Sequence, residues 1–217
     1  MDHDDFDQEP IPGLPEMLPP GEEILWQGAP DWRALTRDAL KVRWVAGYFA
    51  LLFAWQATAA AAVMPWATAL AQSTFYLVLG AVACALLAAI GWCQARATIY
   101  TITNRRVILR IGAALSMTVQ FPFNWIGAAD LVTRRDGTGT IALRTLGTTR
   151  FSYLLMWPHV RPWRFAKTQP ALRAIPRAAE IARLLAEAAQ AEMSLPRVTA
   201  AAPTQPQPTG AMPVPAE

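Results

Sequence analysis

Residues 44–95 read WVAGYFALLFAWQATAAAAVMPWATALAQSTFYLVLGAVACALLAAIGWCQA, and these 52 consecutive residues contain no Asp, Glu, Lys or Arg. A transmembrane helix needs about 20 apolar residues to cross roughly 30 Å of hydrocarbon, at ~1.5 Å per residue. The stretch is long enough for two such helices, which we predict over residues 44–63 and 74–95. Residues 64–73 include a proline and polar side chains, so we expect a turn there.

The alternative to a membrane hairpin is a helical hairpin buried in the core of a water-soluble domain. A chain of 217 residues would then have to bury both helices on every face. Trp44, Trp66 and Trp92 also fall near the predicted water boundaries, where indole side chains are enriched in membrane proteins. We therefore expect an integral membrane protein.

Basic residues flank the two predicted spans and set their expected orientation. Four precede the first span and four follow the second: Arg33, Arg37, Lys41 and Arg43, then Arg96, Arg105, Arg106 and Arg110. The turn between the spans carries no charge. Because basic flanks stay on the cytoplasmic side, we expect a multi-pass protein of a bacterial inner membrane with both termini in the cytoplasm.

After residue 96 the pattern changes from helical to alternating. Alternating β-branched runs predict strands at residues 98–103, 106–111, 117–123, 126–135 and 140–146, with a further candidate at 150–154. Residues 136–139 (DGTG) are typical of a hairpin turn. A helix is predicted from Pro176, because apolar residues at positions 181, 184, 185 and 188 form one stripe. These elements predict an antiparallel β sandwich or barrel capped by a C-terminal helix.

The predicted fold class is an integral membrane α+β protein with five segments. Residues 1–20 are acidic and proline-rich, and residues 194–217 are rich in proline, alanine and threonine, so both are expected to be disordered tails. Residues 21–43 precede the membrane, residues 44–95 form the hairpin, and residues 96–193 form the cytoplasmic domain with its helix.

Basic charge is concentrated after the second predicted span. Residues 96–177 contain thirteen Lys or Arg and two acidic residues. Anionic lipid attracts such a surface by about 1 kcal/mol per basic residue near it, and nucleic acid is the other common partner. Because the domain is tethered to the bilayer, we expect membrane lipids and no nucleic acid. The candidate lipid-facing residues are Arg105, Arg106, Arg110, Arg134 and Arg135.

The sequence contains no recognisable catalytic or metal-binding motif. Its two histidines are His3 and His159, and no HExxH, GxSxG, Walker or GxGxxG pattern occurs. Charged residues make up 16% of the chain, against roughly 25% in ordinary globular proteins, which argues against a free cytosolic enzyme. Two cysteines are too few for a disulfide-stapled secreted module. We predict a protein that is not an enzyme, with no catalytic residue, metal or cofactor, and with no intramembrane histidine to ligate a pigment.

Two segments rich in aromatic and basic side chains are candidate protein-binding sites. Residues 21–32 (GEEILWQGAPDW) precede the first span, and residues 156–165 (MWPHVRPWRF) follow the sheet. Trp-Pro and Arg-Pro steps favour an extended backbone, which would present the second segment as a platform, and Trp and Arg are enriched at binding hot spots. The alternative is that the tryptophans fill the end of the sheet and the arginines are merely solvated. The candidate residues are Trp26, Asp31, Trp32, Trp157, His159, Arg161, Trp163 and Arg164.

Four parts of the sequence together resemble the photosynthetic complex assembly protein PuhB family of purple bacteria. They are GEEILWQGAPDW at residues 21–32, the two-span hairpin, YTITNRRVILRIG at 100–112 and WPHVRPWRF at 157–165. The resemblance covers roughly residues 18–190. The YTITNRRVILR segment alone is less specific, because it is similar to bacterial membrane-anchored PH-like domains in general.

The resemblance implies a PH-like soluble domain of two packed sheets and a C-terminal helix, to which residues 24–27 add a strand although the hairpin intervenes. It also implies a non-catalytic assembly factor for the photosynthetic reaction centre in the inner (intracytoplasmic) membrane. The implied partners are reaction-centre subunits and other photosystem assembly factors, with self-association as a homodimer also expected. The alternative function is that of a membrane-anchored PH-like module that binds anionic lipid headgroups.

Overall fold

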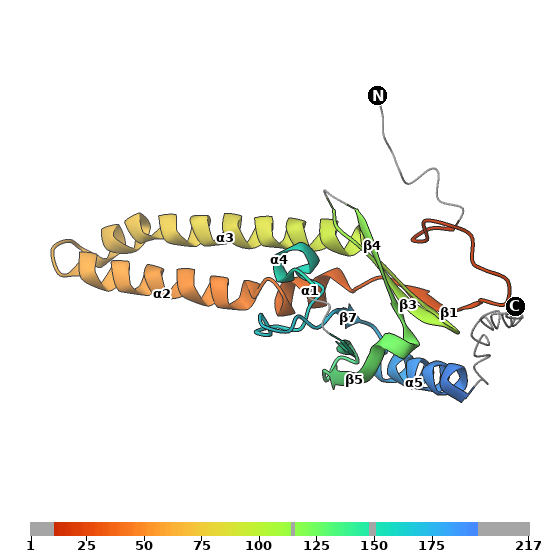
Figure 1. Cartoon of the computed structure of the whole chain (residues 1–217). Coiled ribbons are helices and arrows are strands. Elements are labelled where there is room, and N and C mark those ends of the chain that lie inside the picture. Colours follow the sequence, from red (N-terminus) through yellow and green to blue (C-terminus); the bar gives the residue numbers. More distant parts are fainter. Residues whose placement is uncertain (1–10, 114–115, 148–150, 195–217) are drawn as a thin grey trace, which may run out of the picture.

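The computed structural model describes residues 11–113, 116–147 and 151–194, and it shows a long helical hairpin projecting from a domain of two β-sheets (Figure 1). The hairpin consists of α2 (Val42–Ala61) and α3 (Trp66–Arg96). Both helices are long and apolar enough to cross a membrane. α3 begins eight residues before the predicted start at residue 74, because Pro65 stands just before the helix and nothing after it breaks the helical pattern.

The hairpin exposes most of its apolar surface. In each helix only 11% of the most apolar window is buried, and Trp55, Phe75 and Leu86 are each more than 60% exposed. The two helices nevertheless approach each other closely at Gly80, where a Cβ atom would lie 2.6 Å from the Cβ of Phe49. The hairpin is therefore not buried in a core formed by this chain.

The first sheet joins segments from both sides of the hairpin. Its antiparallel order is β1 (Ile24–Gly28), β2 (Ile99–Thr103), β3 (Arg106–Ile111) and β4 (Met117–Pro122). β1 precedes the hairpin and β2 follows it, and the two pair from Ile24 opposite Thr103 to Gly28 opposite Tyr100. The strand at residues 24–27 that the resemblance implies is thus confirmed.

The second sheet and the C-terminal helix complete the domain. The sheet contains β5 (Ile126–Thr133), β6 (Gly139–Thr145) and β7 (Ala171–Ile175), and η1 (Phe123–Trp125) links it to the first sheet. The predicted strand at 150–154 is wrong, because Tyr153–Met156 form the short helix α4. The apolar stripe of α5 (Ala178–Ser194) is buried as predicted, and it shares one core with side chains of both sheets, including Tyr100, Leu109, Phe121, Leu143 and Leu172.

Residues 11–20 of the predicted disordered N-terminal tail are packed on the domain, which corrects that prediction, and residues 21–23 continue these contacts. Leu14 is 2% exposed, and the carbonyl of Pro12 accepts a hydrogen bond from Nε2 of Gln27 at 2.8 Å. The carboxylate of Glu22 accepts hydrogen bonds from Arg106 and Thr103. The segment therefore packs on β1, β2 and β3. The rest of that predicted tail, residues 1–10, lies outside the described residues, as do residues 195–217 of the C-terminal tail.

The short helix α1 (Trp32–Asp38) fastens the hairpin to the domain. Its Ala34 and Leu35 are buried in a small cluster with Ala95 of α3 and Ala174 of β7. Because one seven-residue helix contacts both a hairpin helix and the second sheet, the hairpin is held at a fixed base. The same helix also brings charged residues of the pre-membrane segment next to the second sheet.

Gly91 of α3 allows this contact, and its replacement tests it. A Cβ atom at Gly91 would overlap the hydroxyl of Thr36, which donates a 2.7 Å hydrogen bond to the carbonyl of Trp32. Gly91→Ala is therefore expected to lower the free energy of unfolding by about 1–3 kcal/mol. Urea unfolding of the detergent-solubilised protein, followed by tryptophan fluorescence, would measure this.

The matched control is Gly47→Ala in α2, where no atom lies within 4 Å of the added Cβ. Since alanine favours a helix over glycine, this control should leave stability unchanged or raise it by roughly 0.5–1 kcal/mol. Equal effects of the two substitutions would show that α1 does not approach α3 closely.

Candidate functional site

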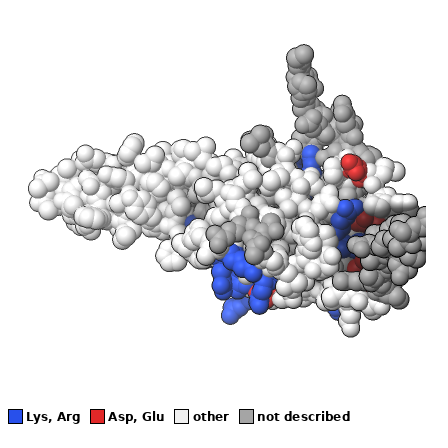
Figure 2. Space-filling model, in the orientation of Figure 1, with Lys and Arg blue, Asp and Glu red and all other residues white. Residues whose placement is uncertain are grey.

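A recess lined by basic side chains lies at the end of the domain from which the hairpin projects. Three parts of the chain build it: α1, the junction between α1 and α2, and the turn between β5 and β6. Its lining residues are Arg37, Asp38, Lys41, Arg43, Trp44, Thr133, Arg134, Arg135 and Asp136, and we call it the basic recess. The part that includes Trp44 has a volume of about 380 Å³. Lys and Arg side chains gather beside the hairpin base in Figure 2, while the outer part of the hairpin shows none.

Two acidic residues hold some of the basic side chains of the recess in place through ion pairs. Asp38 pairs with Arg37 and with Arg134, and Asp136 pairs with Arg37 at 2.8 Å. The Thr138 hydroxyl, the Arg37 guanidinium and the Thr138 backbone N–H lower the pKa of Asp136 to about 2. Hydrogen bonds from Arg37 to the same two carboxylates raise the pKa of Arg37. Arg37 and Arg134 are thus held by ion pairs that tie α1 to the β5–β6 turn.

The remaining basic residues of the recess have no such partner. Within the described ranges, Lys41, Arg43 and Arg135 make no ion pair and no side-chain hydrogen bond, and all three are exposed. Lys41 also adopts a left-handed conformation (φ 56°) where the chain passes from α1 into α2. The recess therefore carries basic groups that are available to an anionic ligand.

A second hollow of about 320 Å³ extends the recess across the second sheet. It shares Asp38, Lys41 and Arg134 with the basic recess and reaches Asp130 and Arg161. Arg161 pairs with Asp130 and donates to the side-chain oxygen of Gln169 at 3.1 Å. Hydrogen bonds from Arg144 and Arg161 lower the pKa of Asp130. Arg161, predicted as a protein-binding residue, therefore lines this hollow while its guanidinium is engaged by Asp130.

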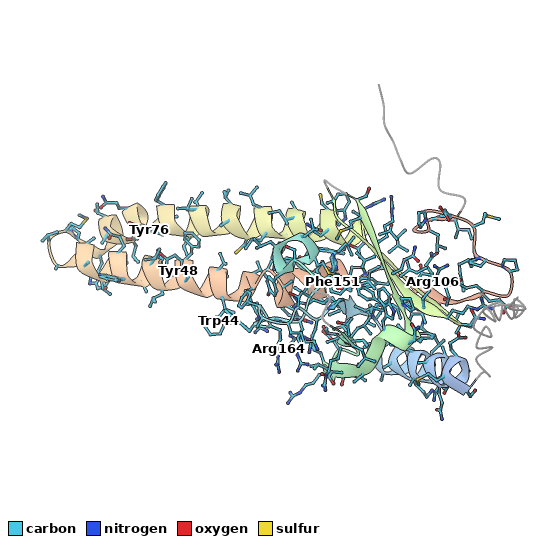
Figure 3. The ribbon with its side chains drawn as sticks, viewed as in Figure 1. Trp44, Tyr48, Tyr76, Arg106, Phe151 and Arg164 are labelled. Atoms are coloured by element: carbon cyan, nitrogen blue, oxygen red, sulfur yellow. The ribbon has the colours of Figure 1, made fainter. Side chains whose placement is uncertain are left out.

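The second predicted segment also forms an exposed apolar surface. The rings of Tyr153 and Phe165 are 4.6 Å apart, and the Trp163 ring lies 6.2 Å from that of Phe165. Trp163 is 81% exposed, and Leu154, which follows Tyr153 in α4, is 85% exposed. We call these four residues, Tyr153, Leu154, Trp163 and Phe165, the aromatic ridge. In Figure 3, Arg164 of the same loop lies on the hairpin side of the domain.

His159 does not belong to an exposed platform, which corrects the prediction. The side chain is 1% exposed. Its Nδ1 lies 2.6 Å from the Tyr100 hydroxyl, and its Nε2 lies 3.1 Å from Oγ1 of Thr98. The Tyr100 oxygen already accepts from the backbone N–H of Arg173, and the Thr98 hydroxyl donates to the carbonyl of Gln94. Tyr100 therefore donates to Nδ1, and neutral His159 donates from Nε2 to Thr98.

The first predicted segment is mostly engaged in the fold. Trp26 is partly buried and packs on the main core. The Asp31 carboxylate accepts a hydrogen bond from the backbone N–H of Ala34 at 2.7 Å, so Asp31 caps the N-terminus of α1. Trp32 is 37% exposed, with the Arg33 guanidinium 5.3 Å from its ring centre. Trp32 is the most exposed of these three candidates. Trp157, a candidate of the second segment, is similarly exposed at 39%.

Three of the five predicted lipid-facing arginines lie elsewhere than expected. Arg106 lies on the side of the domain away from the hairpin (Figure 3), where Glu22 binds it through both carboxylate oxygens at 2.8 Å. Arg105 is next to it in the β2–β3 turn, and Arg110 is only 3% exposed. For Arg105 and Arg106 the cause is topological, because β2 leaves the hairpin and its turn into β3 lies at the far end. Arg110 lies opposite Ile99, at the start of β2, but its side chain is buried. Arg134 and Arg135 do line the basic recess beside the hairpin base.

Sequence reasoning missed Arg37, Lys41 and Arg43 as site residues and used them only to orient the hairpin. The available signal was their position directly before the first span. The contact of Arg37 with a turn almost a hundred residues later depends on the packing of α1, which no local pattern reveals. Among the residues that the structure describes, no group of three or more His, Cys, Asp or Glu side chains is placed to hold a metal ion.

Comparison with known proteins agrees with this architecture. The family model for the bacterial PH domain matches residues 40–189. A Rhodobacter capsulatus protein, named an uncharacterized 23.7 kDa protein in the puhA 5′ region, is 47% identical over 208 residues, which cover 93% of this chain and 95% of the relative. No solved structure matches the chain significantly. Since the family match spans more than half of the sequence and includes every strand except β1, the chain belongs to the bacterial PH domain family.

Proposed function

We propose that this protein is a membrane-anchored, non-catalytic assembly factor for the photosynthetic reaction centre, and that it belongs to the PuhB family within the bacterial PH domain proteins. The relative from Rhodobacter capsulatus carries in its name a position beside puhA, a photosynthesis gene. The residues that resemble the PuhB family cover most of the chain. Together these observations favour a role in photosystem biogenesis.

The proposal includes two membrane spans, α2 and α3. Large apolar side chains cover the outside of the hairpin, where water would make them unfavourable. Trp44 stands near the domain end of the hairpin and Trp66 at its tip, each more than half exposed. Basic residues gather at the domain end, and the tip has no charge. In a bilayer this distribution favours a cytoplasmic location of the β domain.

The main support for the proposed client binding is the exposed aromatic ridge. Water-soluble surfaces seldom leave a tryptophan and a phenylalanine in contact and both more than 60% exposed. Aromatic side chains and arginine are enriched at binding hot spots, and Arg164 lies within the same loop. α3 also exposes Ala81, Ala85 and Ala89 along one face, and small residues allow close packing of a partner helix in lipid. We propose that the ridge and this face contact a membrane subunit of the reaction centre.

A photocrosslinking amino acid at position 163 tests the proposal in cells that are making photosystems. It is expected to form an adduct with a reaction-centre subunit, identified by mass spectrometry. The matched control is position 125, where Trp125 is also exposed but stands at the opposite end of β5 from the basic recess. An equal yield of the same adduct at both positions, or none at 163, would contradict a client-binding ridge.

The substitutions Trp163→Ala and Arg164→Ala should together weaken client binding about thirtyfold, which corresponds to one hot spot of roughly 2 kcal/mol. Trp125→Ala should have little effect. Reaction-centre levels, measured from the absorption of isolated membranes, should fall in the double variant alone. Unchanged levels at equal expression would count against the ridge.

The second candidate function is a lipid-binding module with no protein client, and the basic recess beside the hairpin favours it. Ionic strength separates the two candidates. Binding through exposed charge fades as salt is added, whereas an interface centred on Trp163 and Phe165 should persist. Client recovery in pull-downs at low and high salt therefore decides between them.

A further inference from the structure

We propose that the basic recess binds the phosphate group of an anionic membrane lipid, with Lys41, Arg43 and Arg135 as its ligands and Trp44 beside the lipid glycerol and upper acyl chain. The proposal rests on the membrane anchoring of α2 and α3, and it does not depend on the proposed client. No other surface of the described residues combines unpaired basic groups with the start of an apolar helix.

Charge complementarity points to an anion. Five basic and two acidic side chains line the recess. Both acidic residues are already engaged, since Asp38 and Asp136 hold Arg37 and Arg134 in place. Lys41 and Arg43 line one hollow of the recess, Arg43 and Arg135 line the adjoining one, and none of the three has a partner among the described side chains. An anion bound beside Arg43, which borders both hollows, would receive charge-assisted hydrogen bonds from the basic side chains around it.

The backbone adds to the positive electrostatic potential of the recess. The recess borders the first turn of α2, whose N-terminal residue Val42 follows Lys41. A helix N-terminus carries a partial positive charge and free N–H groups, which favour phosphate. No side chain caps this terminus. The helix end therefore acts with the basic side chains rather than as a separate site.

The position of the recess selects a lipid as the source of the phosphate. Arg43 and Trp44 are the second and third residues of α2, and from Trp44 onward the chain has no charge until Arg96. In a bilayer the indole of Trp44 would lie at headgroup level, where lipid phosphates lie as well. The hollow of the recess that Trp44 lines has a volume of about 380 Å³, which falls within the usual size range of small-molecule sites. A soluble anion would gain nothing from Trp44 or from the neighbouring apolar helix.

Lipid binding to the full-length protein tests the proposal. The protein is purified in a neutral detergent, titrated with phosphatidylglycerol or phosphatidylcholine, and analysed by native mass spectrometry. Phosphatidylglycerol is expected to bind more tightly. The double variant Arg43→Gln, Arg135→Gln should weaken its binding by about 25-fold, roughly fivefold for each basic residue. Neither arginine has an ion pair in the described structure, so the fold should be retained.

The matched control removes two exposed arginines that lie away from the recess, Arg105→Gln and Arg183→Gln. It should bind phosphatidylglycerol as the wild type does. Equal losses in the two double variants, or no preference for phosphatidylglycerol, would overturn the proposed site. Inorganic phosphate is the second probe, and if it bound as tightly as the lipid the recess would be a site for a free anion. Because no client is present, the result is independent of the assembly role.

Discussion

Acidifying the full-length protein from pH 7.5 to pH 4 should lower its free energy of unfolding by about 3 kcal/mol through His159 alone. Burial lowers the pKa of His159 from 6.5 to about 3, and the nearby charge of Arg173 contributes in the same direction. Between these two pKa values the unfolded chain binds a proton at this side chain and the folded chain does not. Since the unfolded state binds more protons, stability falls as the pH falls.

The hydrogen bonds around His159 explain why the folded protein resists protonation. A proton on Nδ1 would face the Tyr100 oxygen, which already accepts from the Arg173 backbone. The Tyr100 hydroxyl would then lose its acceptor inside the core, where burial raises its own pKa as well. A charged imidazolium would also lie close to the guanidinium of Arg173, which is itself nearly buried. Protonation therefore costs both desolvation and a hydrogen bond.

Urea unfolding in a non-ionic detergent, followed by tryptophan fluorescence across this pH range, would measure the effect. His159→Gln should be less stable at pH 7.5 by about 1–3 kcal/mol, and it should lack the part of the pH dependence above pH 4 that the wild type owes to His159. His3→Gln is the matched control and should behave like the wild type. A wild-type stability that stayed flat between pH 6.5 and pH 4 would show that His159 is accessible to protons.

The elements that could be predicted were those with a strong local pattern. The uncharged stretch indicated both long helices, and the alternating runs located β2 to β6 within a few residues. β7 was missed, because Ala171–Ile175 are short, stand between Pro170 and Pro176, and are all buried, so no alternation marks them. α1 was missed for a similar reason. Its seven residues are too few for a helical period to be evident.

The candidate site was less predictable than the fold, because residue type alone does not decide which side chains meet. Arg106 and Arg134 look alike in sequence, yet Arg106 is bound by Glu22 at the far end of the domain and Arg134 by Asp38 at the hairpin base. His159 and Trp163 are four residues apart, but one completes a buried hydrogen-bond network and the other is exposed. Such outcomes depend on the order of the strands and on the packing of α1, which are properties of the whole chain.

Labelling of single cysteines should place the hairpin tip and the β domain on opposite sides of the membrane, with an all-or-none difference. Cys84 and Cys93 are free thiols, so both are first replaced by alanine. A cysteine is then introduced at Val63, which is 83% exposed in the turn between α2 and α3, and separately at Arg164 and Arg105. A membrane-impermeant maleimide should label position 63 in intact spheroplasts and positions 164 and 105 only after permeabilisation.

The physical reason for this expected orientation is the free-energy cost of placing the basic residues anywhere but in water or among lipid headgroups. Moving the basic base of the hairpin into hydrocarbon would cost roughly 2.5–3.5 kcal/mol for each Arg or Lys, whereas the tip at residues 62–65 carries no charge to oppose its passage. Positions 164 and 105 lie at opposite ends of the domain, so agreement between them would show that the whole domain is on one side of the membrane. Labelling of positions 63 and 164 from the same side would remove the membrane anchor. In that case the lipid site beside Trp44 and the client contact at Trp163 would both lose their basis.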